Sequence, residues 1–117
     1  MKGKVLLVDD DAMILAGLKR KLRNQFRIET ALSGEEGLRK IDENGPYAVI
    51  VSDYFMPGMN GIEFLCRVKE TDPDSVRLML TGSADMSTAI QAVNEGSIFQ
   101  FHPKPCPADT LGKAIQS

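Results

Sequence analysis

Short apolar runs alternate with segments of helical periodicity along the whole chain, and this alternation restricts the fold more than any other feature. Each apolar run is followed by a stretch in which apolar residues recur three or four positions apart, the spacing of one face of a helix. Strands that alternate with helices form parallel sheets with helices on both faces. The sequence therefore predicts an α/β fold with five strands and five helices.

The pattern of apolar residues and the capping residues set the bounds of the predicted elements. A continuously apolar run such as Val5–Val8 is typical of a strand that is covered on both faces. Ser33 followed by Glu36 forms a capping box at a helix start, and Gly45 supplies the stop. The predicted strands are Val5–Val8, Phe26–Thr30, Ala48–Val51, Val76–Leu80 and Ile98–Phe101. The helices are marked by inward apolar residues at Ile14–Leu22, Leu38–Ile41, Ile62–Val68, Ile90–Val93 and Leu111–Ile115.

Composition and charge exclude several classes of protein. A chain of 117 residues with 43% hydrophobic residues is expected to form a single domain over 1–117, with no linker or second domain. Its net charge of −2 gives no general electrostatic reason to bind nucleic acid, and no apolar run is long enough to span a membrane. Cys66 and Cys106 match no metal-binding spacing, which favours reduced thiols in a cytoplasmic protein.

Reactive side chains follow four of the predicted strands. Asp9 and Asp10 come after the first strand, Asp53 after the third, Thr81 after the fourth and Lys104 after the fifth. The carboxyl ends of parallel strands meet at one edge of the sheet, which is where such folds place their sites. The sequence has no glycine-rich phosphate loop and no GxSxG nucleophile motif. Clustered carboxylates, a hydroxyl and an amine are therefore predicted at one edge.

The acidic run Asp9–Asp11 needs something that offsets its charge repulsion. Two carboxylates ~4 Å apart repel by about 4 kcal/mol at an effective dielectric constant near 20. A bound cation, a helix N-terminus or free access to water are the alternatives. Asp11 is expected to cap the following helix. Hard oxygen ligands suit Mg²⁺, and a carboxylate beside Mg²⁺ can attack a phosphoryl group to form an acyl phosphate.

Four motifs, VLLVDDD, VSDYFMPGMNG, LTGSAD and FHPKP, together resemble those of response-regulator receiver domains of two-component signalling. The resemblance covers essentially the whole chain, and the pattern Asp-x-x-Met-Pro-x-x-x-Gly after an apolar strand is quite specific. It implies a flavodoxin-like (βα)5 fold, similar to that of chemotaxis regulators, with strand order 2-1-3-4-5. It also implies a signalling switch whose only chemistry is its own phosphorylation and dephosphorylation, rather than an enzyme.

The resemblance assigns the reacting groups. Asp53 would accept the phosphoryl group from a sensor histidine kinase or a phosphotransfer protein. Asp9 and Asp10 would form the acidic Mg²⁺ pocket, with Asp10 the more direct ligand. Asp53 and the backbone carbonyl of Phe55 would complete the ligands. The apolar side chain of Phe55 cannot orient a water, so the phosphorylated state is expected to differ in lifetime from variants with an amide or acid there.

The resemblance also assigns the switch residues. Thr81 would donate a hydrogen bond to a phosphoryl oxygen, and Lys104 would pair with another. Phe101 would turn inward when Thr81 moves and so alter the surface of the fourth helix, fifth strand and fifth helix. Ser83, like Phe55, would influence access of water to the acyl phosphate. The bond between Lys104 and Pro105 would be a candidate cis peptide.

Two other functions are weighed against the phosphorylation switch. An aspartyl-phosphate phosphohydrolase would use Asp9-x-Asp11, but it leaves the residues around Asp53 unexplained. A pseudo-receiver, a binding module that never takes phosphate, would not need the full polar set. The partner that receives the signal would be an output domain or a target protein. A homodimer that forms on phosphorylation is also compatible with the sequence. The short last helix, Ala108–Ser117, favours a receiver taken from a longer response regulator.

Overall fold

The computed structural model describes residues 3–81, 100–103 and 107–116. In these ranges the chain forms the strands β1 (Lys4–Val8), β2 (Arg27–Ala31), β3 (Val49–Asp53), β4 (Val76–Thr81) and β5 (Gln100–Pro103). The helices of the same ranges are α1 (Ala12–Leu22), α2 (Gly34–Asn44), α3 (Gly61–Thr71) and α5 (Ala108–Gln116). The fourth predicted helix, marked by Ile90 and Val93, lies outside the described residues and stays a prediction.

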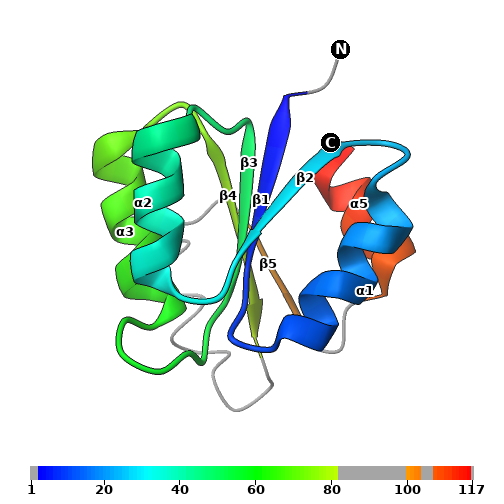
Figure 1. Cartoon of the computed structure of the whole chain (residues 1–117), viewed down its shortest axis with the longest axis horizontal. Coiled ribbons are helices and arrows are strands. Elements are labelled where there is room, and N and C mark those ends of the chain that lie inside the picture. Colours follow the sequence, from blue (N-terminus) through cyan, green and yellow to red (C-terminus); the bar gives the residue numbers. More distant parts are fainter. Residues whose placement is uncertain (1–2, 82–99, 104–106, 117) are drawn as a thin grey trace.

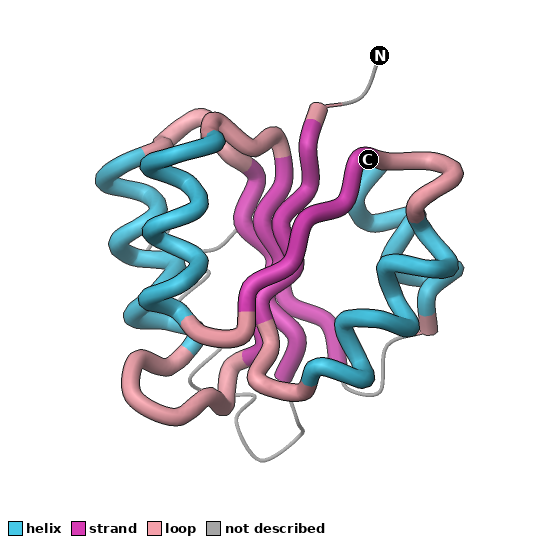
Figure 2. The backbone as a smooth tube through the Cα atoms, viewed as in Figure 1, coloured by secondary structure: helices cyan, strands magenta, loops and turns pink. Residues whose placement is uncertain are grey.

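The strands form one parallel sheet in the order β2-β1-β3-β4-β5, as the sequence analysis predicted. Helices α2 and α3 cover one face of this sheet, and α1 and α5 cover the other (Figure 1). The tube view shows the same three layers, with the strands between two pairs of helices (Figure 2). Among the described residues, no helix has the length and apolar character that crossing a bilayer requires.

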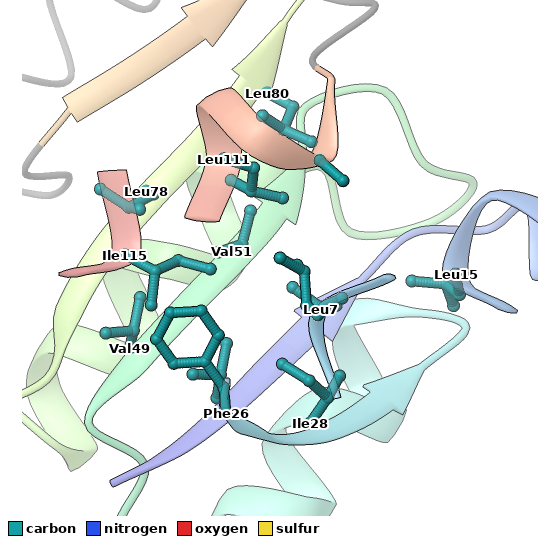
Figure 3. Close-up of a cluster of buried hydrophobic side chains, with 13 residues drawn as sticks. Leu7, Leu15, Phe26, Ile28, Val49, Val51, Leu78, Leu80, Leu111 and Ile115 are labelled. Carbon is teal, nitrogen blue, oxygen red and sulfur yellow. The ribbon is translucent and has the colours of Figure 1, made fainter. Parts of the chain in front are cut away.

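Strands β1, β3 and β4 send alternate side chains into two separate apolar cores, because successive residues of a strand point to opposite faces. On the face of α2 and α3, the strands contribute Leu6, Val8, Ile50 and Met79 to a cluster with Phe64, Leu65 and Val68. On the face of α1 and α5, they contribute Val5, Leu7, Val49, Val51, Leu78 and Leu80 to a cluster with Leu15, Leu111 and Ile115 (Figure 3). This burial on both faces explains the continuous apolar runs of the sequence.

Helix starts follow the predicted caps. The Asp11 carboxylate accepts hydrogen bonds from the N–H groups of Met13 and Ile14, at 3.0 and 3.3 Å. The Ser33 hydroxyl accepts from the Glu36 N–H at 3.1 Å, and Asn60 forms a full capping box with Glu63. These bonds satisfy N–H groups that the first turn of a helix leaves without a partner inside the helix. They fix where α1, α2 and α3 begin beyond the carboxyl edge of the sheet.

Element boundaries differ from the predicted ones where pairing between strands decides them. β3 runs on to Asp53 rather than stopping at Val51, because Ser52 and Asp53 pair with Met79 and Leu80 of β4. Strand β2 starts at Arg27, since the N–H of Phe26 bonds to the carbonyl of Leu22 and so belongs to the turn after α1.

Two further predictions are corrected at α1 and β5. Ile14, predicted to face inward, is 38% exposed. Strand β5 reaches Pro103, whose partner is Thr81 of β4. The predicted strand ended at Phe101, because a proline does not look like a strand residue in the sequence alone.

Tyr47 makes the stability of the fold sensitive to alkaline pH. Its side chain is buried and its hydroxyl donates to the Glu29 carboxylate. Burial, reinforced by Glu29, raises the pKa of Tyr47 above its ordinary value. The folded state therefore holds the phenol proton more tightly than the unfolded chain, where the pKa is about 10. This contribution to stability is complete below that pH and is lost as the pH rises further.

Between about pH 8 and pH 11, we expect the free energy of unfolding of the Tyr47→Phe variant to fall less than that of the parent, because phenylalanine has no proton to release. Urea unfolding at both pH values measures this. Tyr54→Phe is the control, since it keeps the Tyr47 phenol and should retain the alkaline loss of the parent. Equal losses in the parent and in Tyr47→Phe would contradict the assignment to Tyr47.

Candidate functional site

The carboxylates of Asp9, Asp10 and Asp53 meet at the carboxyl edge of the sheet. Asp9 and Asp10 directly follow β1, and Asp53 is the last residue of β3. β1 and β3 are neighbours, with Val8 opposite Ser52, so both strands end at the same level. One oxygen from each of the three carboxylates lies within 4.8 Å of the others. The predicted acidic cluster is therefore present.

Burial makes this cluster electrostatically costly. Asp9 is 4% exposed and Asp53 is 6% exposed, whereas Asp10 faces solvent. Two like charges at 4.8 Å, the upper limit of the distances in this cluster, repel by about 3 kcal/mol at an effective dielectric constant near 20. The Asp9 carboxylate accepts a hydrogen bond from the Asp11 N–H at 2.9 Å, which offsets part of its own burial. An all-oxygen set with one solvent-facing member fits Mg²⁺, which binds through carboxylates and keeps several waters.

The third acid of the run, Asp11, has a different role. Its carboxylate caps α1 through the N–H groups of Met13 and Ile14, as predicted, and it is not part of the three-carboxylate group. The Asp9-x-Asp11 pair that a phosphohydrolase would use is therefore divided between the cluster and the helix cap. Within the described residues, the geometry instead brings Asp9 and Asp10, which follow β1, together with Asp53 of β3.

The backbone around Asp53 is held by several hydrogen bonds. The Tyr54 N–H donates to the Leu80 carbonyl at 2.9 Å, and the Gly61 N–H donates to the Tyr54 carbonyl at 2.8 Å. The buried Ser52 hydroxyl donates to the Asp53 carbonyl at 2.9 Å. These bonds connect the end of β3 to β4 and to the first turn of α3. The backbone at Asp53 is therefore held in place, although Asp53 is the last residue of its strand.

The loop from 54 to 60 lies at the surface but is anchored beneath. Met56 is buried in the core under α2 and α3, and Met59 packs against the same core. Gly58 has a φ of +76°, a conformation that other residues rarely adopt, and so allows the chain to turn towards α3. The Phe55 side chain is 80% exposed. It therefore lies outside the core, two residues after Asp53, at the position that the family resemblance links to access of water to the acyl phosphate.

The structure describes the remaining predicted residues only in part. The backbone of Thr81 ends β4, and the backbone of Phe101 lies in β5 opposite Met79. Their side chains lie outside the described part of the structure, as do the whole residues Ser83, Lys104 and Pro105. The roles assigned to these five residues stay predictions. A cis peptide bond is present elsewhere, between Gly45 and Pro46.

Two residues that hold the site were not assigned a role from the sequence. Ser52 is a small polar residue within the apolar run VIVSD, and Gly61 is the last residue of the motif that begins at Asp53. A Cβ atom at Gly61 would lie 2.4 Å from the Asp53 carbonyl oxygen. The signal for Ser52 was its hydroxyl in a strand that is otherwise apolar. The signal for Gly61 was a residue without a side chain at the start of a helix.

Comparison with known proteins places these features in one family. A sequence model of the family "Response regulator receiver domain" matches residues 5–116. The hydrogenase transcriptional regulatory protein HoxA of Cupriavidus necator is 39% identical over 110 residues, which cover 94% of this chain and 23% of HoxA. The C4-dicarboxylate transport transcriptional regulatory protein DctD of Pseudomonas aeruginosa is 33% identical over 113 residues, or 97% of this chain and 24% of DctD. The chain thus spans about a quarter of the length of these relatives.

A solved structure shows the same relationship. A response regulator receiver domain protein from Clostridium thermocellum superposes with a TM-score of 0.90 at 36% identity, covering 97% of this chain and 90% of that one. The chain belongs to the family of response-regulator receiver domains.

Proposed function

We propose that this domain is a phosphorylation switch in which Asp53 accepts a phosphoryl group from a sensor histidine kinase or a phosphotransfer protein. The observation that carries the proposal is the group of three carboxylates, from Asp9, Asp10 and Asp53, within 4.8 Å at the carboxyl edge. Two of these carboxylates, those of Asp9 and Asp53, are buried, and buried like charges this close are unfavourable unless positive charge offsets their repulsion. Membership of the receiver family supports the same reading.

The carboxylates of Asp9, Asp10 and Asp53, with the backbone carbonyl of Phe55, would hold Mg²⁺. When bound, Mg²⁺ neutralises negative charge on these acids and on an incoming phosphoryl group. The Asp53 carboxylate is the nucleophile. Its oxygen forms a bond to phosphorus while the bond between phosphorus and the donor breaks, and the donor leaves with that electron pair. Asp9 holds its carboxylate towards the site through the hydrogen bond from the Asp11 N–H.

The remaining steps rest on the family resemblance and on residues at the same edge. The Thr81 hydroxyl and the Lys104 ammonium bind phosphoryl oxygens, and Ser83 adjusts access of water. Phe101 then turns inward, and the surface that includes β5 and α5 changes with it. This is a shift between two populated states, favoured by the new contacts to the phosphoryl group.

The proposed unit is one receiver domain over residues 1–117 that controls an output domain or a target protein. Relatives such as HoxA and DctD are named as transcriptional regulators and are about four times as long as the matched segment. Their names support a role of this kind in a larger regulator. A phosphorylation-dependent homodimer is one way in which the altered surface around α5 can act.

Phosphorylation by a small donor tests the proposal directly. The chain is incubated with acetyl phosphate and Mg²⁺, and its intact mass is measured with and without a chelator. We expect the gain of one phosphoryl group in Mg²⁺ and none in the chelator. A folded protein that gains no mass would reject the switch and favour the pseudo-receiver. Circular dichroism of the same samples establishes that the protein is folded.

Phe55 is expected to give a long-lived phosphorylated state. Its exposed aromatic side chain cannot donate or accept a hydrogen bond, so it cannot orient a water towards the acyl phosphate. In the Phe55→Asn variant the amide can hold such a water, and we expect faster dephosphorylation. The loss of the phosphoryl mass with time, after removal of the donor, measures the rate. The same rate in Phe55→Asn, Phe55→Leu and the parent would show that this position has no influence.

A further inference from the structure

We propose that the buried Ser52 hydroxyl is a positioning group for the phospho-acceptor Asp53; this rests on the proposed function of Asp53. Ser52 is fully buried, and its hydroxyl donates to the carbonyl of the next residue, Asp53, at 2.9 Å. Nothing else in strand β3 is polar except Asp53 itself. The hydroxyl is therefore placed beside the reacting residue in a strand whose other side chains serve the two cores.

The peptide unit between Asp53 and Tyr54 is held at both of its ends. Its carbonyl oxygen accepts from the Ser52 hydroxyl, and its N–H donates to the Leu80 carbonyl of β4 at 2.9 Å. A peptide unit is planar, so two hydrogen bonds on opposite sides resist its rotation. This rotation is the one that changes the direction in which the backbone leaves Asp53. Ser52 and β4 together thus fix the backbone on which the Asp53 carboxylate stands.

Close packing on the Asp53 carbonyl adds to this restriction. The Cα of Gly61 lies so near that a Cβ there would be 2.4 Å from the carbonyl oxygen. The same peptide unit leads to Phe55, whose carbonyl is a proposed Mg²⁺ ligand. A rotation would therefore displace the ligands that come from 53 and 55 relative to Asp9 and Asp10. Misplacement of a reacting group by about 1 Å can cost on the order of 100-fold in rate.

Ser75 provides a comparison with a second buried serine, away from the site, whose hydroxyl also donates to a backbone carbonyl. It is also buried, and its hydroxyl donates to the Asp72 carbonyl at 2.8 Å, just before β4 begins. It accepts from Arg77 as well. Ser75 lies at the opposite edge of the sheet, because β4 starts where β1 and β3 start. Loss of the Ser52 hydroxyl removes its bond to the Asp53 backbone, whereas loss of the Ser75 hydroxyl removes bonds to Asp72 and Arg77 and leaves the Asp53 backbone untouched.

The test compares Ser52→Ala, Ser52→Cys and Ser75→Ala with the parent. Calorimetric titration with Mg²⁺ gives its affinity, intact mass after acetyl phosphate gives the phosphorylation rate, and urea unfolding gives stability. We expect Ser52→Ala to weaken Mg²⁺ binding and to slow phosphorylation by about ten-fold, with Ser75→Ala within about two-fold of the parent. Ser52→Cys preserves the side-chain volume with a weaker donor and should follow Ser52→Ala in both measurements.

Each outcome shows whether the Ser52 hydroxyl positions Asp53 or only contributes to stability. If Ser52→Ala matches the parent in Mg²⁺ affinity and rate, or if Ser75→Ala is impaired as much, the proposal is wrong. If Ser52→Ala does not fold, Ser52→Cys decides in the same way. If the parent itself gains no phosphoryl group, the proposed function fails. The Mg²⁺ affinities of the variants then still test the positioning of the ligands by Ser52.

Discussion

Replacing Asp53 by asparagine is expected to abolish phosphorylation and, in metal-free buffer, to stabilise the fold. The amide is not a nucleophile, so no acyl phosphate forms. The substitution also removes one of the two buried charges that lie within 4.8 Å of each other, those of Asp9 and Asp53. Their repulsion is about 3 kcal/mol at an effective dielectric constant near 20, before screening by dissolved ions. We therefore expect a gain of roughly 1–2 kcal/mol in the free energy of unfolding.

Urea unfolding in a chelator, with intact mass after acetyl phosphate, measures both effects of Asp53→Asn. With Mg²⁺ the order of stability should reverse, because only the parent keeps the complete ligand set and is stabilised by binding. Asp11→Asn is the matched control. Asparagine caps helices as well as aspartate does, and Asp11 lies outside the cluster, so this variant should be phosphorylated without a gain in stability. An Asp53→Asn protein less stable than the parent in the chelator would contradict the electrostatic argument.

The alternation of strands and helices could be predicted because its signals are local, whereas the order of the strands came from the family resemblance. Strand and helix periodicities alternate regularly, and a sheet of parallel strands brings every strand end to one edge. The meeting of Asp9 with Asp53 followed from that rule, although they lie 44 positions apart in the sequence. The caps at Asp11, Ser33 and Asn60 were equally visible, since each depends on residues within one helical turn.

What the sequence did not reveal depends on contacts between distant segments. The end of β3 at Asp53 is set by pairing with Leu80, and no local pattern carries that information. The same holds for the hydrogen bond of Ser52 and for the approach of Gly61 to the Asp53 carbonyl. The roles of Thr81 and Lys104 came from the family resemblance. Composition and spacing alone predicted only a hydroxyl and an amine at this edge.

Gly61→Ala is expected to be among the most destabilising single substitutions in the chain. The added Cβ would lie 2.4 Å from the Asp53 carbonyl oxygen and 2.9 Å from the Tyr54 Cα, both backbone atoms that no side-chain rotation can move away. Relief requires α3 to move from β3, which also weakens the bond from the Gly61 N–H to the Tyr54 carbonyl. Overpacking of this kind costs about 1–3 kcal/mol, and a weakened hydrogen bond about 1 kcal/mol more.

Gly17→Ala adds the same methyl group to a helix where nothing lies within 4 Å of the new Cβ. Without a clash, alanine inside α1 should stabilise the fold by about 0.5–1 kcal/mol. Urea unfolding of both variants therefore separates crowding at Gly61 from the general effect of a helical alanine. The Mg²⁺ affinity of Gly61→Ala then shows whether β3 or α3 moves to relieve the clash. If β3 moves, Gly61→Ala loses affinity together with stability. If α3 moves alone, stability falls while the carboxylates keep their ligand geometry, and the Asp53 backbone is held by β4 and Ser52 without the help of Gly61.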